Sequence, residues 1–138
     1  MAIPILAINY IAVLVSAIIG FVIGMAWYKV FGRQWMSLMG LTPEKLQGMK
    51  KGMAKPMLGG FVATLIMAFV LAHVIGYSQA STIPEGLMGG FWVWLGFVAT
   101  VMINSVLWEG KPVKLYALNV AHYLVVLLVM GAILAVWV

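Results

Sequence analysis

The chain has 138 residues, of which 65% are apolar and 8% are charged. Soluble domains are about 45–50% apolar and about 25% charged. The composition of this chain therefore excludes an ordinary water-soluble fold. It has no cysteine, which excludes disulfides, zinc–thiolate sites, iron–sulfur clusters and thiol nucleophiles. Its net charge of +5 comes from basic residues that flank apolar segments without a nucleic-acid-binding motif, so we expect no nucleic-acid partner.

Four segments are long and apolar enough to cross a bilayer. A membrane-spanning helix needs about 20 mostly apolar residues, because each residue adds about 1.5 Å. Barrel strands are shorter and alternate in polarity, so continuous apolar runs predict helices. We expect one all-α membrane domain over residues 1–138, a four-transmembrane-helix bundle with spans at about residues 5–27, 57–77, 86–108 and 113–137.

The first span, residues 5–27, resembles a signal peptide only in part. No Lys or Arg precedes Lys29, and the apolar run is longer than a signal peptide needs, so we expect a retained span. Small residues recur at every fourth position and predict a groove for close helix packing. They are Ala12, Ser16, Gly20 and Gly24 in the first span, and Gly96, Thr100 and Asn104 in the third. The partner is either a neighbouring span or a second copy of the chain.

The link between the first two spans, residues 28–56, begins in an aromatic cluster. Trp27, Tyr28, Phe31 and Trp35 are typical of an anchor at the membrane interface, and Trp108, Tyr116 and Trp137 fit the same role. Further along, the sequence Thr42-Pro43-Glu44 is typical of a helix start, with a capping hydroxyl, a proline and an acid in the first turn.

That start predicts a short amphipathic helix lying at the inner lipid interface. Leu41, Leu46, Met49 and Met53 recur at helical spacing. We expect the basic residues to contact anionic lipid headgroups, and these are Lys45, Lys50, Lys51 and Lys55. The alternative is a loop that folds back beneath the bundle.

All eight basic residues lie in the links on one side of the membrane. Six lie between the first and second spans, Lys111 and Lys114 lie between the third and fourth, and residues 78–85 contain none. The positive-inside rule places both basic links in the cytoplasm and both termini outside. We therefore expect a multi-pass protein of the plasma membrane.

Polar side chains of the spans lie at similar depths above the basic ends and predict a polar layer in the inner half of the bilayer. The candidates are Thr64, Asn104, Ser105, Glu109, Asn119, His122 and Tyr123. They either hydrogen-bond between helices, or they include protonatable groups, Glu109 and His122, beside a water-filled path. For His73 at the other end, we expect a hydrogen bond to Asn9 or Tyr10.

Catalysis has little support in the sequence. There is no Asp, the three acids lie in separate segments, and neither a phosphate-binding loop nor a nucleophile elbow is present. His73 and His122 lie at different depths, so we expect no metal or haem site shared between them. We expect no catalytic residues, no metal and no cofactor.

The chain resembles the domain-of-unknown-function 1761 family of small bacterial membrane proteins. The resemblance rests on NYIAVLVSAIIGFVIGMAWYKVFGRQWM at 9–36, LTPEKLQGM at 41–49, WLGFVATVMINSVLWEGKPVKLYALNVAHYL at 94–124 and the closing MGAILAVW, and NSVLWEGKPVKLYALN is its most specific part. It implies a four-span protein of the bacterial inner membrane and supplies no activity, catalytic residue or ligand.

Two functions are consistent with these features. The first is a homo-oligomeric structural or interaction protein, favoured by the small-residue groove and by spans without charge. The second is a small transporter or channel that uses the polar layer. Membrane lipids are the expected partners in either case, with a small-molecule substrate left open.

Overall fold

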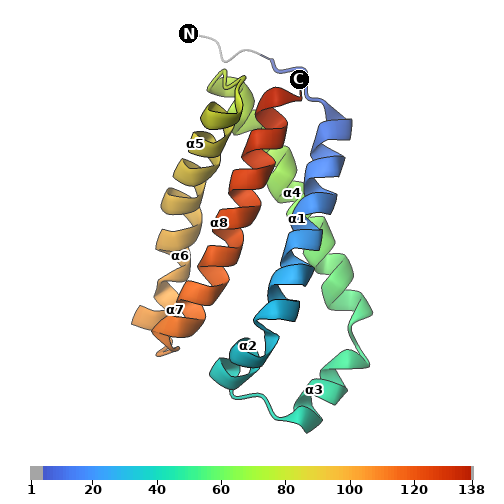
Figure 1. The fold of residues 1–138 in the computed structure, drawn as a ribbon, viewed down its shortest axis with the longest axis vertical. Helices are drawn as coiled ribbons and strands as arrows, with labels where there is room; N and C mark the ends of the chain where they lie inside the picture. Colours follow the sequence, from blue (N-terminus) through green and yellow to red (C-terminus); the bar gives the residue numbers. More distant parts are fainter. Residues whose placement is uncertain (1–4, 138) are drawn as a thin grey trace.

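The computed structural model describes residues 5–137, and that part of the chain consists of helices joined by short connections (Figure 1). The elements are α1 (Tyr10–Val30), α2 (Gly32–Met39), α3 (Pro43–Lys50), α4 (Ala54–Tyr77), α5 (Ile83–Trp94), the π-helical turn η1 (Leu95–Ala99), α6 (Thr100–Met102), α7 (Asn104–Leu107) and α8 (Val113–Val136). Helices α1, α4 and α8 and the continuous run Ile83–Leu107 are long and apolar enough to cross a membrane. The prediction of an all-α bundle with four spans is confirmed.

Capping residues decide where the helices begin. α1 starts at Tyr10 rather than at residue 5, because the side chain of Asn9 accepts a hydrogen bond from the backbone N–H of Ala12. The third span starts at Ile83 rather than at 86, because Thr82 and Glu85 form a reciprocal capping box. Spans two and four agree with the expected limits more closely, at Ala54–Tyr77 and Val113–Val136.

The link between α1 and α4 forms two short helices, where the sequence predicted one. α3 begins as expected, with the Thr42 hydroxyl accepting from the N–H of Lys45 at 3.3 Å. α2 was missed, because the aromatic residues around Phe31 and Trp35 were interpreted as an interface anchor and Gly32 is a poor helix former. α2 ends at Gly40, whose positive φ of 69° reverses the chain toward α3.

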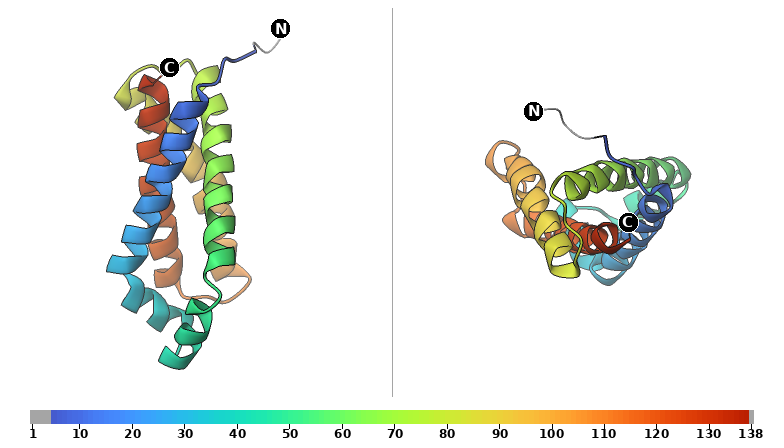
Figure 2. Two further views of the ribbon diagram at one scale, coloured as in Figure 1. Left: turned by 90° about the vertical axis from the view of Figure 1, so that its right-hand side faces the viewer. Right: turned by 90° about the horizontal axis from the view of Figure 1, so that it is seen from above.

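The two ends of the bundle differ in charge and in packing. α2, α3 and the α7–α8 link lie at one end, which we call the basic end, and α1 begins and α8 finishes at the opposite end (Figure 2). The buried residues of α1 lie in its first half, up to Gly20, and those of α4 lie in its second half, from Ala68 to Ile75. These halves share the opposite end, so the tight core lies there. Toward the basic end α1 and α4 separate (Figure 1).

The closest helix contact joins α5 to α8 through glycines. A methyl group added to Gly86 would overlap the carbonyl oxygen of Gly131, and one added to Gly90 would overlap that of Leu127. Backbones that approach this closely gain van der Waals packing, which replaces the hydrophobic drive that is lost in lipid. The third span therefore contacts α8 through Gly86 and Gly90, which the predicted small-residue pattern did not include.

The predicted packing residues Gly96 and Thr100 face away from the bundle. The prediction that they pack against a neighbouring span of the same chain is therefore wrong. Both are exposed, and no atom lies within 4 Å of a methyl group added to Gly96. The inward face continues instead through Trp94, whose indole N–H donates to the carbonyl of Val120 at 2.7 Å. Gly96 follows Trp94 by two residues, which places it about 200° around the helix.

The glycine contact predicts different costs for two matched substitutions. Gly90→Ala should lower the free energy of unfolding by about 1–3 kcal/mol, because α5 and α8 must separate to fit the methyl group. Gly96→Ala adds the same group to the same span in open space and should be neutral. Reversible denaturation in mixed micelles, followed by tryptophan fluorescence, measures both. Equal stabilities for the two variants would refute the assigned contact.

Candidate functional site

Two adjoining cavities open near the basic end. The lateral cavity, about 790 Å³, lies between α1, α4 and α8. The basal cavity, about 890 Å³, lies among α1, α2, α3, α6, α7 and α8. Both are lined by Tyr28, Lys29, Met53 and Tyr123, so we treat them as one site and call it the vestibule.

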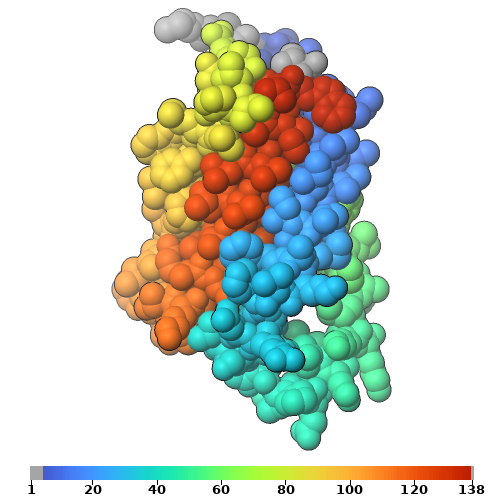
Figure 3. All heavy atoms as spheres, in the orientation of Figure 1, coloured from blue at the N-terminus to red at the C-terminus, as the bar shows by residue number. Residues whose placement is uncertain are grey.

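The lateral cavity exists because small residues line the walls where α1 and α4 separate. Gly20 and Gly24 of α1 and Gly60 and Ala63 of α4 are among its lining residues, and α8 closes the back. The surface is interrupted at this level by an opening between α1 and the beginning of α4 (Figure 3). The lateral cavity therefore opens through the side of the bundle.

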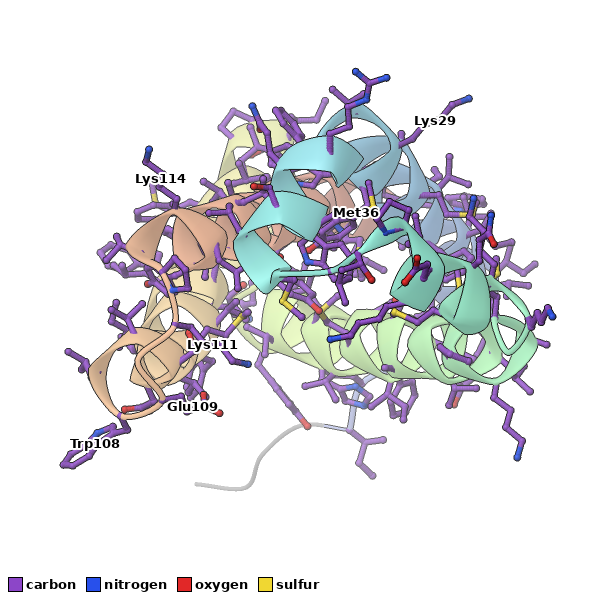
Figure 4. The ribbon with its side chains drawn as sticks, turned by 90° about the horizontal axis from the view of Figure 1, so that it is seen from below. Lys29, Met36, Trp108, Glu109, Lys111 and Lys114 are labelled. Atoms are coloured by element: carbon purple, nitrogen blue, oxygen red, sulfur yellow. The ribbon has the colours of Figure 1, made fainter. Side chains whose placement is uncertain are left out.

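Methionine is the most frequent residue in the lining. Eight of the eleven methionines in the sequence line the vestibule: Met25, Met36, Met39, Met49, Met53, Met57, Met67 and Met102. Viewed from the basic end, Met36 lies on the side of α2 that faces the middle of this end (Figure 4). Methionine has an unbranched, polarizable side chain that adapts to varied apolar shapes, so such a lining suits a flexible apolar ligand.

His122 lies in the back wall of the lateral cavity. Its side chain is 9% exposed, and its ring packs beside Tyr28 and Trp27, with ring centroids 5.3 and 6.3 Å away. Neither ring nitrogen has a hydrogen-bond partner among residues 5–137. Within the same residues, no three His, Asp or Glu side chains are grouped to hold a metal ion. His122 therefore places one unpaired donor and one unpaired acceptor in the wall of the cavity.

The predicted polar layer is divided between the vestibule and the outer surface. Asn119, His122, Tyr123, Ser105 and Thr64 line the vestibule. Asn104 and Glu109 do not, and both are exposed. Glu109 lies at the edge of the basic end, near Trp108 (Figure 4). The prediction of one continuous polar layer that includes Glu109 is therefore wrong, because α7 turns Asn104 and Glu109 away from α8.

Two of the polar candidates are already hydrogen-bonded. The Tyr28 hydroxyl donates to the side-chain oxygen of Asn119 at 2.7 Å, joining α1 to α8. The Thr64 hydroxyl donates to the carbonyl of Gly60 in its own helix at 2.8 Å. Asn119 thus has the interhelical role that the structural interpretation of the layer predicted.

The aromatic residues expected at the interface divide in the same way. The Trp27 indole donates to the carbonyl of Leu118 at 3.2 Å, and the Tyr116 hydroxyl donates to that of Ala99 at 2.7 Å. Together with Tyr28, these side chains connect helices, a role that the sequence analysis did not assign to them. Trp108 does extend outward from the α7–α8 link (Figure 4).

His73 has a different partner from the one expected. Its Nδ1 donates to the carbonyl of Phe69 at 2.9 Å, one turn earlier in α4. Asn9, the expected partner, uses its side-chain oxygen to cap α1, and Tyr10 stacks on Phe69 with centroids 6.3 Å apart. No site forms around His73 from these contacts.

The small-residue groove of α1 packs within the chain. Ala12 and Ser16 are fully buried. A methyl group on Gly20 would lie 3.0 Å from the Met130 sulfur, and one on Gly24 would lie 2.9 Å from Nε2 of His122. The structure thus favours the intramolecular alternative for this groove, with α8 as the neighbour.

Three lysines line the vestibule, and only Lys50 is among the four that the sequence assigned to lipid headgroups. Lys29, Lys50 and Lys111 are lining residues, whereas Lys45, Lys51 and Lys55 are not. Lys111 extends toward the middle of the basic end, while Lys29 and Lys114 extend outward (Figure 4). Sequence reasoning missed Lys111 and the methionines, although the four-residue spacing of Met49, Met53 and Met57 was a visible signal.

A double-mutant cycle tests the link between Tyr28 and Asn119. Tyr28→Phe and Asn119→Leu should each lower stability, and the double variant should lose less than the sum, with a coupling energy of about 0.6–1.7 kcal/mol. The measurement is reversible unfolding of all four proteins in bicelles. Strictly additive losses would show that the two side chains do not interact.

Comparison with known proteins identifies a family and no function. The profile of a family described as "Protein of unknown function (DUF1761)" matches residues 11–135. No curated protein and no solved structure matches the chain. The match extends from the start of α1 to the end of α8 and includes every residue that lines the vestibule. The chain therefore belongs to the DUF1761 family of proteins of unknown function.

Proposed function

We propose that this protein binds a small amphiphilic molecule from the membrane in the vestibule, and that it acts as a binding protein or carrier rather than as an enzyme. The observation that carries the proposal is the methionine-lined lateral cavity with an unpaired, buried histidine in its wall. An apolar pocket with a few convergent polar groups is the usual form of a small-molecule site.

The dimensions of the vestibule support this function. Sites for small ligands commonly measure about 300–1,000 Å³, and each cavity falls within that range. The opening lies between the end of α1 and the beginning of α4 (Figure 3), and in a bilayer we expect lipid chains beside it. A ligand with an apolar chain can thus enter from the bilayer without exposing that chain to water.

Orientation and location follow from charge. All eight basic residues lie at the basic end of the structure. By the positive-inside rule, we propose that this end faces the cytoplasm and that both termini face outward, in the plasma membrane of a bacterium. The vestibule then lies in the inner half of the bilayer and opens toward the inner leaflet, with α3 near the lipid headgroups.

Self-association is a second candidate property, favoured by the outer face of the third span. Gly96, Thr100 and Asn104 form an exposed stripe with four-residue spacing. The Asn104 amide donates to the carbonyl of Val101 at 3.0 Å, which leaves its side-chain oxygen available to a second copy. A homo-oligomer formed through this stripe would leave the lateral opening between α1 and α4 free.

Photolabelling tests binding in the vestibule. In phosphatidylcholine nanodiscs, a stearyl alcohol and a stearate, each with a diazirine in the chain, should label the lining residues of α4 and α8, as read by peptide mass spectrometry. Ala63→Trp fills the lateral cavity and should reduce that labelling about tenfold. Val62→Trp, on the neighbouring residue that faces outward, is the control. Equal labelling of both variants by both probes would reject the function.

Cysteine labelling tests the orientation, and the absence of native cysteine leaves no background. In intact bacterial cells, a membrane-impermeant maleimide should label Ser81→Cys, which lies between α4 and α5. It should label Lys51→Cys, at the end of α3, only after the cells are permeabilised. The reverse pattern would invert the proposed topology.

A further inference from the structure

We infer that the ligand of the vestibule is an amphiphile with one chain, an anionic head group held by Lys50 and Lys111, and an uncharged hydrogen-bonding group along the chain that meets His122. This inference rests on the proposed function and gives the ligand its chemical class. It is argued from the charge of the basal cavity, the shape of the vestibule and the unpaired ring of His122.

The lining of the basal cavity carries positive charge only. Lys29, Lys50 and Lys111 contribute to it, and no Asp or Glu is among the described residues that line either cavity. Lysine side chains bordering an apolar cavity without an acid attract a carboxylate or phosphate and disfavour a cationic head group. Lys111 extends toward the middle of this end, in reach of such a group (Figure 4).

Helix ends add to this field. α8 begins at Val113 beside Lys111, and α4 begins at Ala54 beside Met53, so both positive helix ends border the vestibule. Neither helix has a capping side chain or an acid in its first turn. α3 and α5, by contrast, begin with Thr caps and with acids in their first turns. The N–H groups of α8 therefore remain available to an anion.

The vestibule continues from the lysines into an apolar interior. Its two cavities adjoin at Tyr28 and Tyr123, and the lateral cavity reaches Val126. Val113 and Val126 are about 20 Å apart along α8, so a chain anchored at Lys111 has a path about that long. One chain lying along this path would reach both the lysines and His122, so we infer a ligand with a single chain.

His122 specifies the second polar group. Its ring lies along this path, about 14 Å beyond Val113. A buried donor or acceptor without a partner costs about 1–3 kcal/mol, and a hydroxyl or carbonyl on the chain would remove that cost. A chain without a polar group would leave both nitrogens unpaired. An oxygen atom midway along the chain would lie at the depth of His122 and could form a hydrogen bond with its ring.

Competition against the stearate photoprobe tests the inference in the same nanodiscs. Three matched competitors separate its parts: stearyl alcohol has a neutral head, stearate has an anionic head, and 12-hydroxystearate adds an oxygen midway along the chain. We expect stearate to compete about tenfold better than the alcohol, and 12-hydroxystearate about fivefold better than stearate. Phosphatidylglycerol, an anionic lipid with two chains, should compete poorly.

Matched variants assign these preferences to residues. The double variant Lys50→Gln/Lys111→Gln should abolish the preference for stearate over stearyl alcohol. The control, Lys51→Gln/Lys114→Gln, removes the same charge from residues outside the vestibule and should keep this preference. His122→Phe should abolish the preference for the hydroxylated chain, with His73→Phe as the control. Both controls also report on folding, through their unchanged labelling.

The outcomes distinguish the inference from the function. Two results would overturn the assignment of an anionic head group. One is equal competition by stearate and stearyl alcohol, and the other is a head-group preference that survives Lys50→Gln/Lys111→Gln. Equal competition by stearate and 12-hydroxystearate would overturn the role of His122. Phosphatidylglycerol competing as well as stearate would overturn the single chain. In each case, probe labelling that still depends on Ala63 would leave the proposed function standing.

Discussion

Close approach of helix backbones at the end opposite the basic residues is the constraint on which this bundle depends. In lipid no hydrophobic force brings the helices together, so packing must come from small residues that allow contact. Gly86, Gly90 and Gly131 supply it between α5 and α8, and Ala12 and Ser16 supply it along α1. Because all of these lie toward one end, the core forms there, and the helices diverge toward the other.

Hydrogen bonds replace close packing where the helices diverge. Trp27, Tyr28 and Trp94 all donate to acceptors on one turn of α8, from Leu118 to Val120. Each is a long aromatic side chain that bridges a gap and keeps its polar atom paired, as a low-dielectric environment requires. These contacts hold the walls apart at a defined distance, so the vestibule is a structured opening rather than a packing defect.

Periodicity and charge predicted the spans, the basic end and the start of α3, because apolar length and capping chemistry are local properties of the sequence. They did not predict the vestibule, which depends on where helices separate. The small-residue spacing selected Gly96 and not Gly90, although Gly90 makes the contact with α8 and Gly96 makes none, because the rotation of the helix about α8 is not visible in the spacing. In the same way, Trp27 and Tyr28 have the composition of an interface anchor, and their direction toward α8 is a tertiary property.

The same asymmetry limits what the protein can do with a ligand. The vestibule reaches Val126 and ends where Met130, Leu127 and Leu71 are fully or almost fully buried. A molecule in the vestibule can exchange with the bilayer or the basic end, and passage to the opposite end requires the tightest contacts of the fold to part. Because a packed core yields in discrete steps rather than continuously, the proposed ligand would be loaded and released on one side.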